Sequence, residues 1–103
     1  MNLTVAADYK RLNDLLMESM DPAMSSFSSR YQITLRESEI LILIAVYGFS
    51  NREIAEQCAI TEKTVKNHIA NVMNKLGVKS MRKLLSLLFS YVLSRSFAYG
   101  GNI

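Results

Sequence analysis

The sequence predicts an all-α fold, and three observations support that prediction. Apolar residues recur at steps of three and four along most of the chain, and no segment sustains the strict alternation of a half-buried strand. Two capping boxes, Thr34 with Glu37 and Ser50 with Glu53, mark the starts of helices. Glycines follow two of the apolar-periodic segments, where a helix commonly stops. With 103 residues, the chain is expected to form one domain.

The composition excludes several classes of protein. Half of the residues are apolar and 20% are charged, which excludes a disordered tail. The longest uncharged runs, residues 40–51 and 84–94, are shorter than the roughly 18 residues of a membrane span, and the N-terminus lacks the compact apolar block of a secretory signal. One cysteine and one histidine exclude an internal disulfide and a tetrahedral zinc site. We therefore expect a cytoplasmic protein with no membrane partner, no metal and no cofactor.

The first expected helix covers about residues 4–20. Its apolar residues form one stripe at steps of three and four: Val5, Tyr9, Leu12, Leu16 and Met20. Asp21 should end this helix, because the residue before a proline, here Pro22, disfavours the α region. Residues 22–31 contain four serines and are predicted to be a linker with one loose turn. An N-terminal helix and a serine-rich linker are therefore assigned to residues 1–30.

Two shorter helices should follow, each with its own start and stop. In the first, Thr34 caps the start, and Gly48 supplies a left-handed stop. Its apolar residues are Ile40, Leu41, Leu43, Ile44 and Tyr47. Ser50 opens the second helix, which carries Ile54, Ala55 and Cys58.

A longer helix should begin after Thr61 and end at Gly77. Its apolar stripe consists of Val65, Ile69, Val72, Met73 and Leu76. Ser80 is the expected N-cap of a last helix that runs to about Ser94.

A short helix, a tight turn and a longer helix with a polar outer face are typical of a helix-turn-helix. The small residue Ala55 would let the two helices approach closely, and Ile60 in the turn would fill the angle between them. The alternative is an αα-corner in some other helical domain.

The charge is unevenly distributed along the chain. No acidic residue follows Glu62, whereas seven basic residues do, so the net charge of +3 conceals a basic C-terminal portion. Such asymmetry favours a polyanionic partner, although a solvated basic helix face would look the same.

The polar face of the longer helix suits nucleic acid. Its expected exposed residues are Lys63, Thr64, Lys66, Asn67, Ala70, Asn71 and Asn74. Lysine can neutralise phosphate or meet guanine acceptors, asparagine can pair with adenine, and the methyl of Ala70 suits a thymine methyl. The alternative is that these side chains contact only water. His68 lies near the edge of the apolar stripe, and no Ser, Cys or carboxylate is spaced to activate it, so we do not expect an enzyme.

A long run of the sequence resembles the LuxR/NarL-type helix-turn-helix family, which includes the spore regulator GerE. The matching elements are Thr34, Arg36-Glu37, Gly48, SNREIA at 50–55, TEKTVKNHI at 61–69 and KLGVKS at 75–80. The resemblance implies a four-helix DNA-binding domain over residues 31–95, preceded by the extra N-terminal helix and followed by a tail over residues 96–103. The sequence departs from the family pattern at Leu35, where proline is usual, and at Met81, where arginine is frequent.

The resemblance also implies roles for single residues. Lys66 and Asn67 take the positions that read bases, and the chemistry of Ala70 and Asn71 adds them to this group. Positions that approach the DNA backbone fall on Lys63, Thr64 and His68, and the charges of Lys75 and Arg82 place them there as well.

The last helix is apolar around nearly its whole circumference, which favours an interface. We expect a homodimer through Leu84, Leu88, Tyr91 and Val92, extended by Leu12 and Leu16. The alternative is burial of this helix by its own chain.

These observations predict a sequence-specific transcription regulator that binds double-stranded DNA as a homodimer at the nucleoid. Only about 30 residues precede the resemblance, so we expect a stand-alone protein without a sensor domain and without a small-molecule ligand. The alternative is an adaptor that pairs with a larger regulator or with RNA polymerase and does not read DNA. Salt-dependent binding to duplex DNA would distinguish the two functions.

Overall fold

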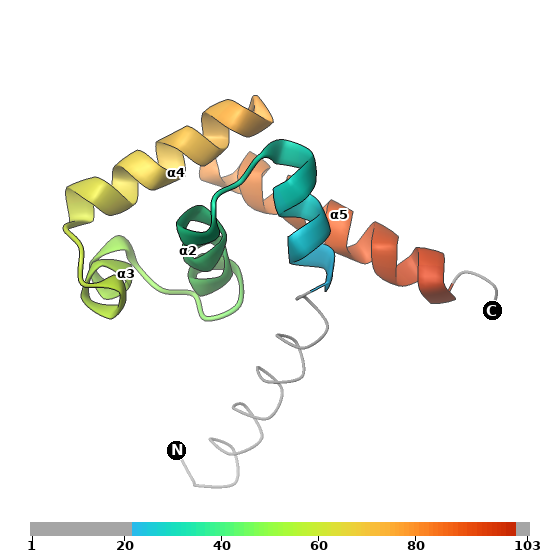
Figure 1. Ribbon diagram of the computed structural model, residues 1–103, viewed down its shortest axis with the longest axis horizontal. Coiled ribbons are helices and arrows are strands. Elements are labelled where there is room, and N and C mark those ends of the chain that lie inside the picture. The colour runs from blue at the N-terminus through green and yellow to red at the C-terminus, as the bar shows by residue number, and fades with distance from the viewer. Residues whose placement is uncertain (1–21, 101–103) are drawn as a thin grey trace, which may run out of the picture.

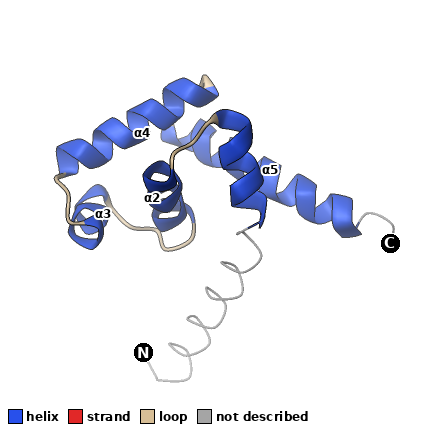
Figure 2. Cartoon of the chain, in the orientation of Figure 1, coloured by secondary structure: helices blue, strands red, loops and turns tan. Residues whose placement is uncertain are grey.

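The computed structural model describes residues 22–100, and this part of the chain is helical apart from short turns and loops (Figures 1 and 2). The predicted all-α fold is confirmed for these residues. The helices cover residues 22–31, Leu35–Ala45 (α2), Asn51–Cys58 (α3), Glu62–Leu76 (α4) and Met81–Gly100 (α5). The helix expected over residues 4–20 lies outside the described residues.

Both predicted capping boxes are confirmed. At the start of α2, the Glu37 amide donates to Thr34 Oγ1 at 3.2 Å, and the Thr34 amide donates to Glu37 Oε1 at 2.9 Å. The start of α3 repeats the arrangement, with Glu53 N to Ser50 Oγ at 3.2 Å and Ser50 N to Glu53 Oε1 at 2.9 Å. Each box satisfies two amides that have no partner within the helix, so the sequence fixes both starts locally.

Left-handed residues end α3 and α4. Gly77 ends α4 at φ +69°, as predicted. The end of α2 comes earlier than the predicted stop at Gly48: its C-cap is Val46, which is right-handed, and Gly48 follows two residues later at φ +67°. The turn between α3 and α4 uses Ala59 at φ +55°, a conformation that glycine adopts more easily. There the Ile60 amide donates to the Ala55 carbonyl at 3.0 Å, which closes the end of α3.

Two clusters of buried apolar residues form the core. The first joins helix 22–31, α2, α4 and α5 through Met24, Phe27, Ile33, Leu41, Val72, Leu84 and Leu88. The second joins α2, α3 and α4 through Ile40, Ile54, Ala55, Val65 and Ile69. Met73 and Met81 are partly buried against both clusters, so α4 rests on a continuous apolar base.

The segment predicted to be a serine-rich linker is instead a helix over residues 22–31. Met24 and Phe27 are three residues apart, so they lie on the same side of the helix, and both are buried in the first core cluster. Ser25 and Ser29 lie on the exposed side. Burial of this apolar face outweighs the low helix propensity of the serines. The prediction of a linker considered the serines and did not consider this burial.

The same helix corrects the predicted dimer surface. Leu84 and Leu88 are fully buried inside this chain, so they cannot form the contact with a second copy that the sequence predicted. Tyr91 packs edge to face on Phe27 with ring centres 5.4 Å apart, and its hydroxyl lies 2.6 Å from Ser26 Oγ.

Val92 is also partly buried against this cluster. Helix 22–31 therefore covers the face of α5 that the sequence predicted to contact a second copy. Of the other predicted dimer residues, Leu12 and Leu16 lie outside the described part of the chain.

The last helix also runs further than expected. It continues past Ser94 to Gly100, so the described part of the segment assigned to a tail, residues 96–100, is helical. Within residues 22–100, no helix is both long and apolar enough to cross a membrane.

Candidate nucleic-acid interface

The pair α3 and α4 forms the predicted helix-turn-helix (Figure 1). Eight residues of α3 and fifteen of α4 are joined by a turn around the left-handed Ala59. Ile54 and the small Ala55 are buried together with Val65 and Ile69 in the second core cluster. Close packing at these positions fixes the angle at which α4 is presented to a partner.

The N-terminus of α4 is capped by Thr61. Its Oγ1 accepts a hydrogen bond from the Thr64 amide at 3.1 Å and lies 2.9 Å from the Thr64 hydroxyl. The half-buried Thr64 side chain is thus oriented by the cap, at the end of the helix where the macrodipole favours an anion. Thr64 was predicted to approach the DNA backbone, and its place in the first turn suits that role.

The outer face of α4 is free of partners within the described range. Of the residues predicted to be exposed, Thr64 is half-buried and the others are exposed: Lys63, Lys66, Asn67, Ala70, Asn71 and Asn74. No hydrogen bond or ion pair joins any of these side chains to another residue between positions 22 and 95. The amide and ammonium groups on this face are therefore available to an external ligand.

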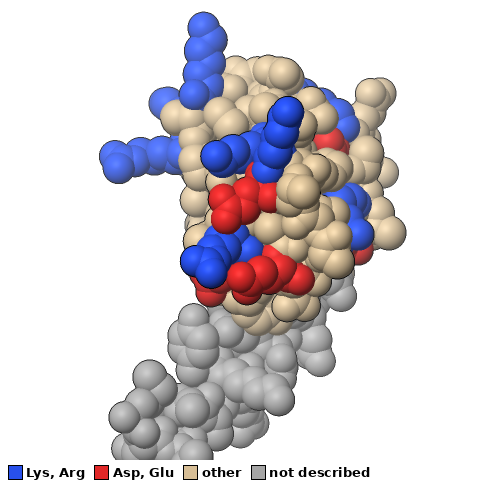
Figure 3. All heavy atoms as spheres, turned by 90° about the vertical axis from the view of Figure 1, so that its left-hand side faces the viewer, with Lys and Arg blue, Asp and Glu red and all other residues tan. Residues whose placement is uncertain are grey.

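Charge is unevenly distributed on the end of the molecule that carries the turn of the helix-turn-helix. In Figure 3, the side chains that project from the upper part of this face are mainly basic, whereas acidic and basic side chains lie next to one another lower down. The acids of α3 are partly neutralised there, since Arg52 and Glu56 pair at 3.4 Å. The basic side chains on the outer face of α4 therefore make it more attractive to a polyanion than the outer side of α3.

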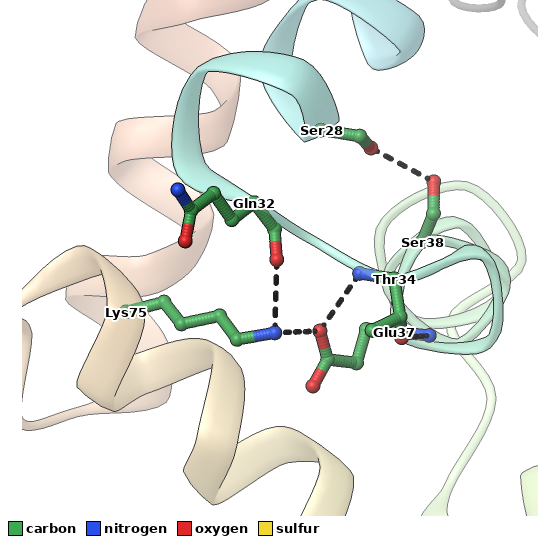
Figure 4. Close-up of polar contacts among 6 residues, drawn as sticks. All are labelled: Ser28, Gln32, Thr34, Glu37, Ser38 and Lys75. Atoms are coloured by element: carbon green, nitrogen blue, oxygen red, sulfur yellow. Dashed lines mark hydrogen bonds and ion pairs between the residues drawn. The ribbon is translucent and has the colours of Figure 1, made fainter.

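Lys75 has a different environment from the one its predicted phosphate role requires. Its Nζ donates to Glu37 Oε1 at 2.6 Å and to the Gln32 carbonyl at 2.9 Å (Figure 4). Only 4% of the Glu37 side chain and 31% of the Lys75 side chain are exposed. One ammonium thus joins α4, the start of α2 and the turn after helix 22–31, and its charge is engaged inside the fold.

The electrostatics of Glu37 follow from this contact. Burial alone would raise the pKa of Glu37, but hydrogen bonds from Lys75 and from the Thr34 amide, with the positive charge of Lys75, outweigh it and hold the pKa below its ordinary value. The carboxylate is therefore charged in the folded protein at neutral pH and keeps Lys75 in place.

The remaining predicted backbone contacts lie at the edges of α4. His68 is half-buried on α4, and Arg82 is exposed in the first turn of α5. Lys79 and Lys83 are also exposed beside Arg82 in the sequence, so the start of α5 is basic. The sequence reasoning did not single out these two lysines, although they belong to the acid-free C-terminal run that it identified.

Comparison with known proteins is consistent with this geometry. The profile of a family described as "Bacterial regulatory proteins, luxR family" matches residues 31–88. The chain is 46% identical over 59 residues to the response regulator protein VraR of Staphylococcus aureus, and equally so to VraR of Staphylococcus saprophyticus and Staphylococcus epidermidis. The match covers 57% of this chain and 28% of each relative. No solved structure shows significant similarity to the chain.

Proposed function

The chain belongs to the luxR family of bacterial regulatory proteins, and from this premise we propose that it is a transcription regulator that reads a specific duplex DNA sequence with the outer face of α4. The observation that carries the proposal is the free outer face of α4, which presents lysines and asparagines without an acidic residue after the first position of the helix. A relative named as a response regulator supports the regulatory role.

The chemistry of this face matches the floor of a DNA major groove. The groove is about 12 Å wide and admits one helix. Asn67 and Asn71 can pair with adenine N6 and N7, and Lys66 can donate to guanine acceptors. Ala70 lies one turn after Lys66. Its short side chain lets the helix approach the bases closely, and its methyl can contact the methyl of thymine.

The DNA backbone is expected to meet groups at the edges of α4. Lys63 is exposed in its first turn, Thr64 is held by the cap, and His68 lies on the flank. Arg82 supplies a charge from α5. We leave Lys75 out of this group, because its ammonium is already paired with Glu37.

We also propose that the regulator binds as a homodimer, through a part of α5 different from the one the sequence indicated. Phe89 and Leu93 are 55% and 48% exposed and lie one turn apart on the same side of the helix. Two copies joined there by a twofold axis would present two α4 helices to half-sites about 10 bp apart.

Selection of bound sequences from a random duplex pool tests the proposed function. We expect a twofold-symmetric site to be enriched, with binding that weakens steeply between about 50 and 200 mM salt, because lysine and arginine contacts release counterions. Binding that stays constant over this range, without an enriched sequence, would refute DNA reading and favour the adaptor function.

A further inference from the structure

A groove of about 580 Å³ lies between helix 22–31 and the outer side of α2. Its lining consists of Pro22, Met24, Ser25, Ser28, Ile33, Thr34, Leu35, Ser38, Glu39 and Ile42. Leu35, the first residue of α2, is 79% exposed at this groove and is the most exposed large apolar residue among residues 22–95. An apolar hollow with a projecting leucine is a docking surface for another apolar element.

This surface lies on the side of α2 that faces away from α4. The residues of α2 that are buried, Glu37, Ile40 and Leu41, form the opposite side, and Glu37 contacts α4 there. A second hollow of about 300 Å³, between α2 and α3, shares Glu39 and Ile42 with the groove. The exposed side of α2 is therefore flanked by hollows along its length.

The chain itself provides a segment that fits this surface. Residues 1–21 lead directly into Pro22, which forms part of the groove wall. The apolar stripe identified in that segment needs a partner for burial: Val5, Tyr9, Leu12, Leu16 and Met20. The residue before a proline disfavours the α region, so the chain can change direction at Asp21, between the apolar stripe and Pro22.

We propose that residues 4–20 of the same chain bind in this groove with their apolar stripe against the exposed Leu35 and the half-buried Ile42. Ser25 and Ser28 are small and leave room for incoming side chains. Glu39 in the groove wall already pairs at 3.2 Å with Arg36 of the neighbouring hollow, so covering it leaves no unpaired charge. This inference does not depend on DNA binding, because the occupied side of α2 faces away from α4.

A double-mutant cycle in the full-length chain tests the contact. The two changes are Leu35→Gln in the groove and Leu16→Gln in the segment, since glutamine keeps a helix propensity close to that of leucine. Each single change should lower the melting temperature by about 5–10 °C, and combining them should add little more, because both remove the same contact. Far-UV circular dichroism verifies that each variant remains folded.

Tyr47→Gln, at an exposed apolar residue after α2 that does not line the groove, is the matched control, and its effect should add fully to that of Leu16→Gln. Two results would overturn the proposal. In one, Leu35→Gln leaves the melting temperature unchanged or its effect adds fully to that of Leu16→Gln. In the other, the coupling disappears on dilution of the protein, which would mean that the groove binds the segment of a second copy.

Discussion

Replacing Lys75 by methionine removes the ammonium that joins α4 to the start of α2 and to the turn at Gln32, and it leaves Glu37 as a buried carboxylate without its cation. Breaking a buried ion pair by removing one partner costs roughly 3–5 kcal/mol. The Lys75 side chain is 31% exposed, and Glu37 keeps the Thr34 amide as a donor. Both facts reduce the loss of stability to the lower end of this range or slightly below it. We expect Lys75→Met to lower the free energy of unfolding by about 2–3 kcal/mol, measured by urea denaturation at neutral pH.

The partner variant and the double variant separate the ion pair from other effects of the substitution. Glu37→Gln retains the capping box, because glutamine can also accept from the Thr34 amide. In the double variant no charge is left buried alone, so its loss of stability should be clearly smaller than the sum of the two single losses. A loss below about 0.5 kcal/mol for Lys75→Met, the scale of ordinary surface substitutions, would refute the structural role of Lys75.

Three further predictions follow from named contacts. Because the pKa of Glu37 is lowered in the folded protein, its carboxylate stabilises the fold at pH values above the ordinary pKa of 4.5, and this contribution is lost as pH falls through the folded pKa. Urea denaturation should show that the difference in free energy of unfolding between the natural protein and Glu37→Gln becomes smaller in acid. A difference that does not depend on pH would contradict this. Ala59→Gly should raise stability by about 0.5–1 kcal/mol, because alanine is strained at φ +55°, and thermal unfolding measures it. Phe89→Glu should change a dimer to a folded monomer in sedimentation, since the side chain is exposed in one chain, and identical sedimentation of both proteins would exclude this dimer surface.

The parts of the fold that depend on local signals could be predicted from the sequence. The capping residues Thr34, Ser50 and Thr61 satisfy amides three residues away, so their effect is written in a short stretch of chain. The outer face of α4 could be predicted for the same reason, because the buried residues Val65 and Ile69 fix the opposite side.

The parts that depend on distant contacts could not be predicted. Helix 22–31 contains four serines, and only its packing on α5, through Phe27 and Tyr91, shows that it belongs to the core. Because that helix was not predicted, its contact surface on α5, which includes Leu84 and Leu88, was predicted to be a dimer interface. Lys75 and Glu37 are 38 residues apart, so no local pattern indicates that they pair.

The central claim, that α4 reads DNA bases, is tested most directly by titrating Asn67→Ala and Lys63→Ala against the selected duplex and a scrambled one. Asn67 is uncharged and central on the outer face, so its loss should weaken binding to the selected duplex by about 1–3 kcal/mol per half-site and leave the scrambled duplex unaffected. Lys63→Ala should weaken both duplexes alike and reduce the salt slope by about one unit per chain. Equal weakening of both duplexes by Asn67→Ala would contradict base reading by this face of α4.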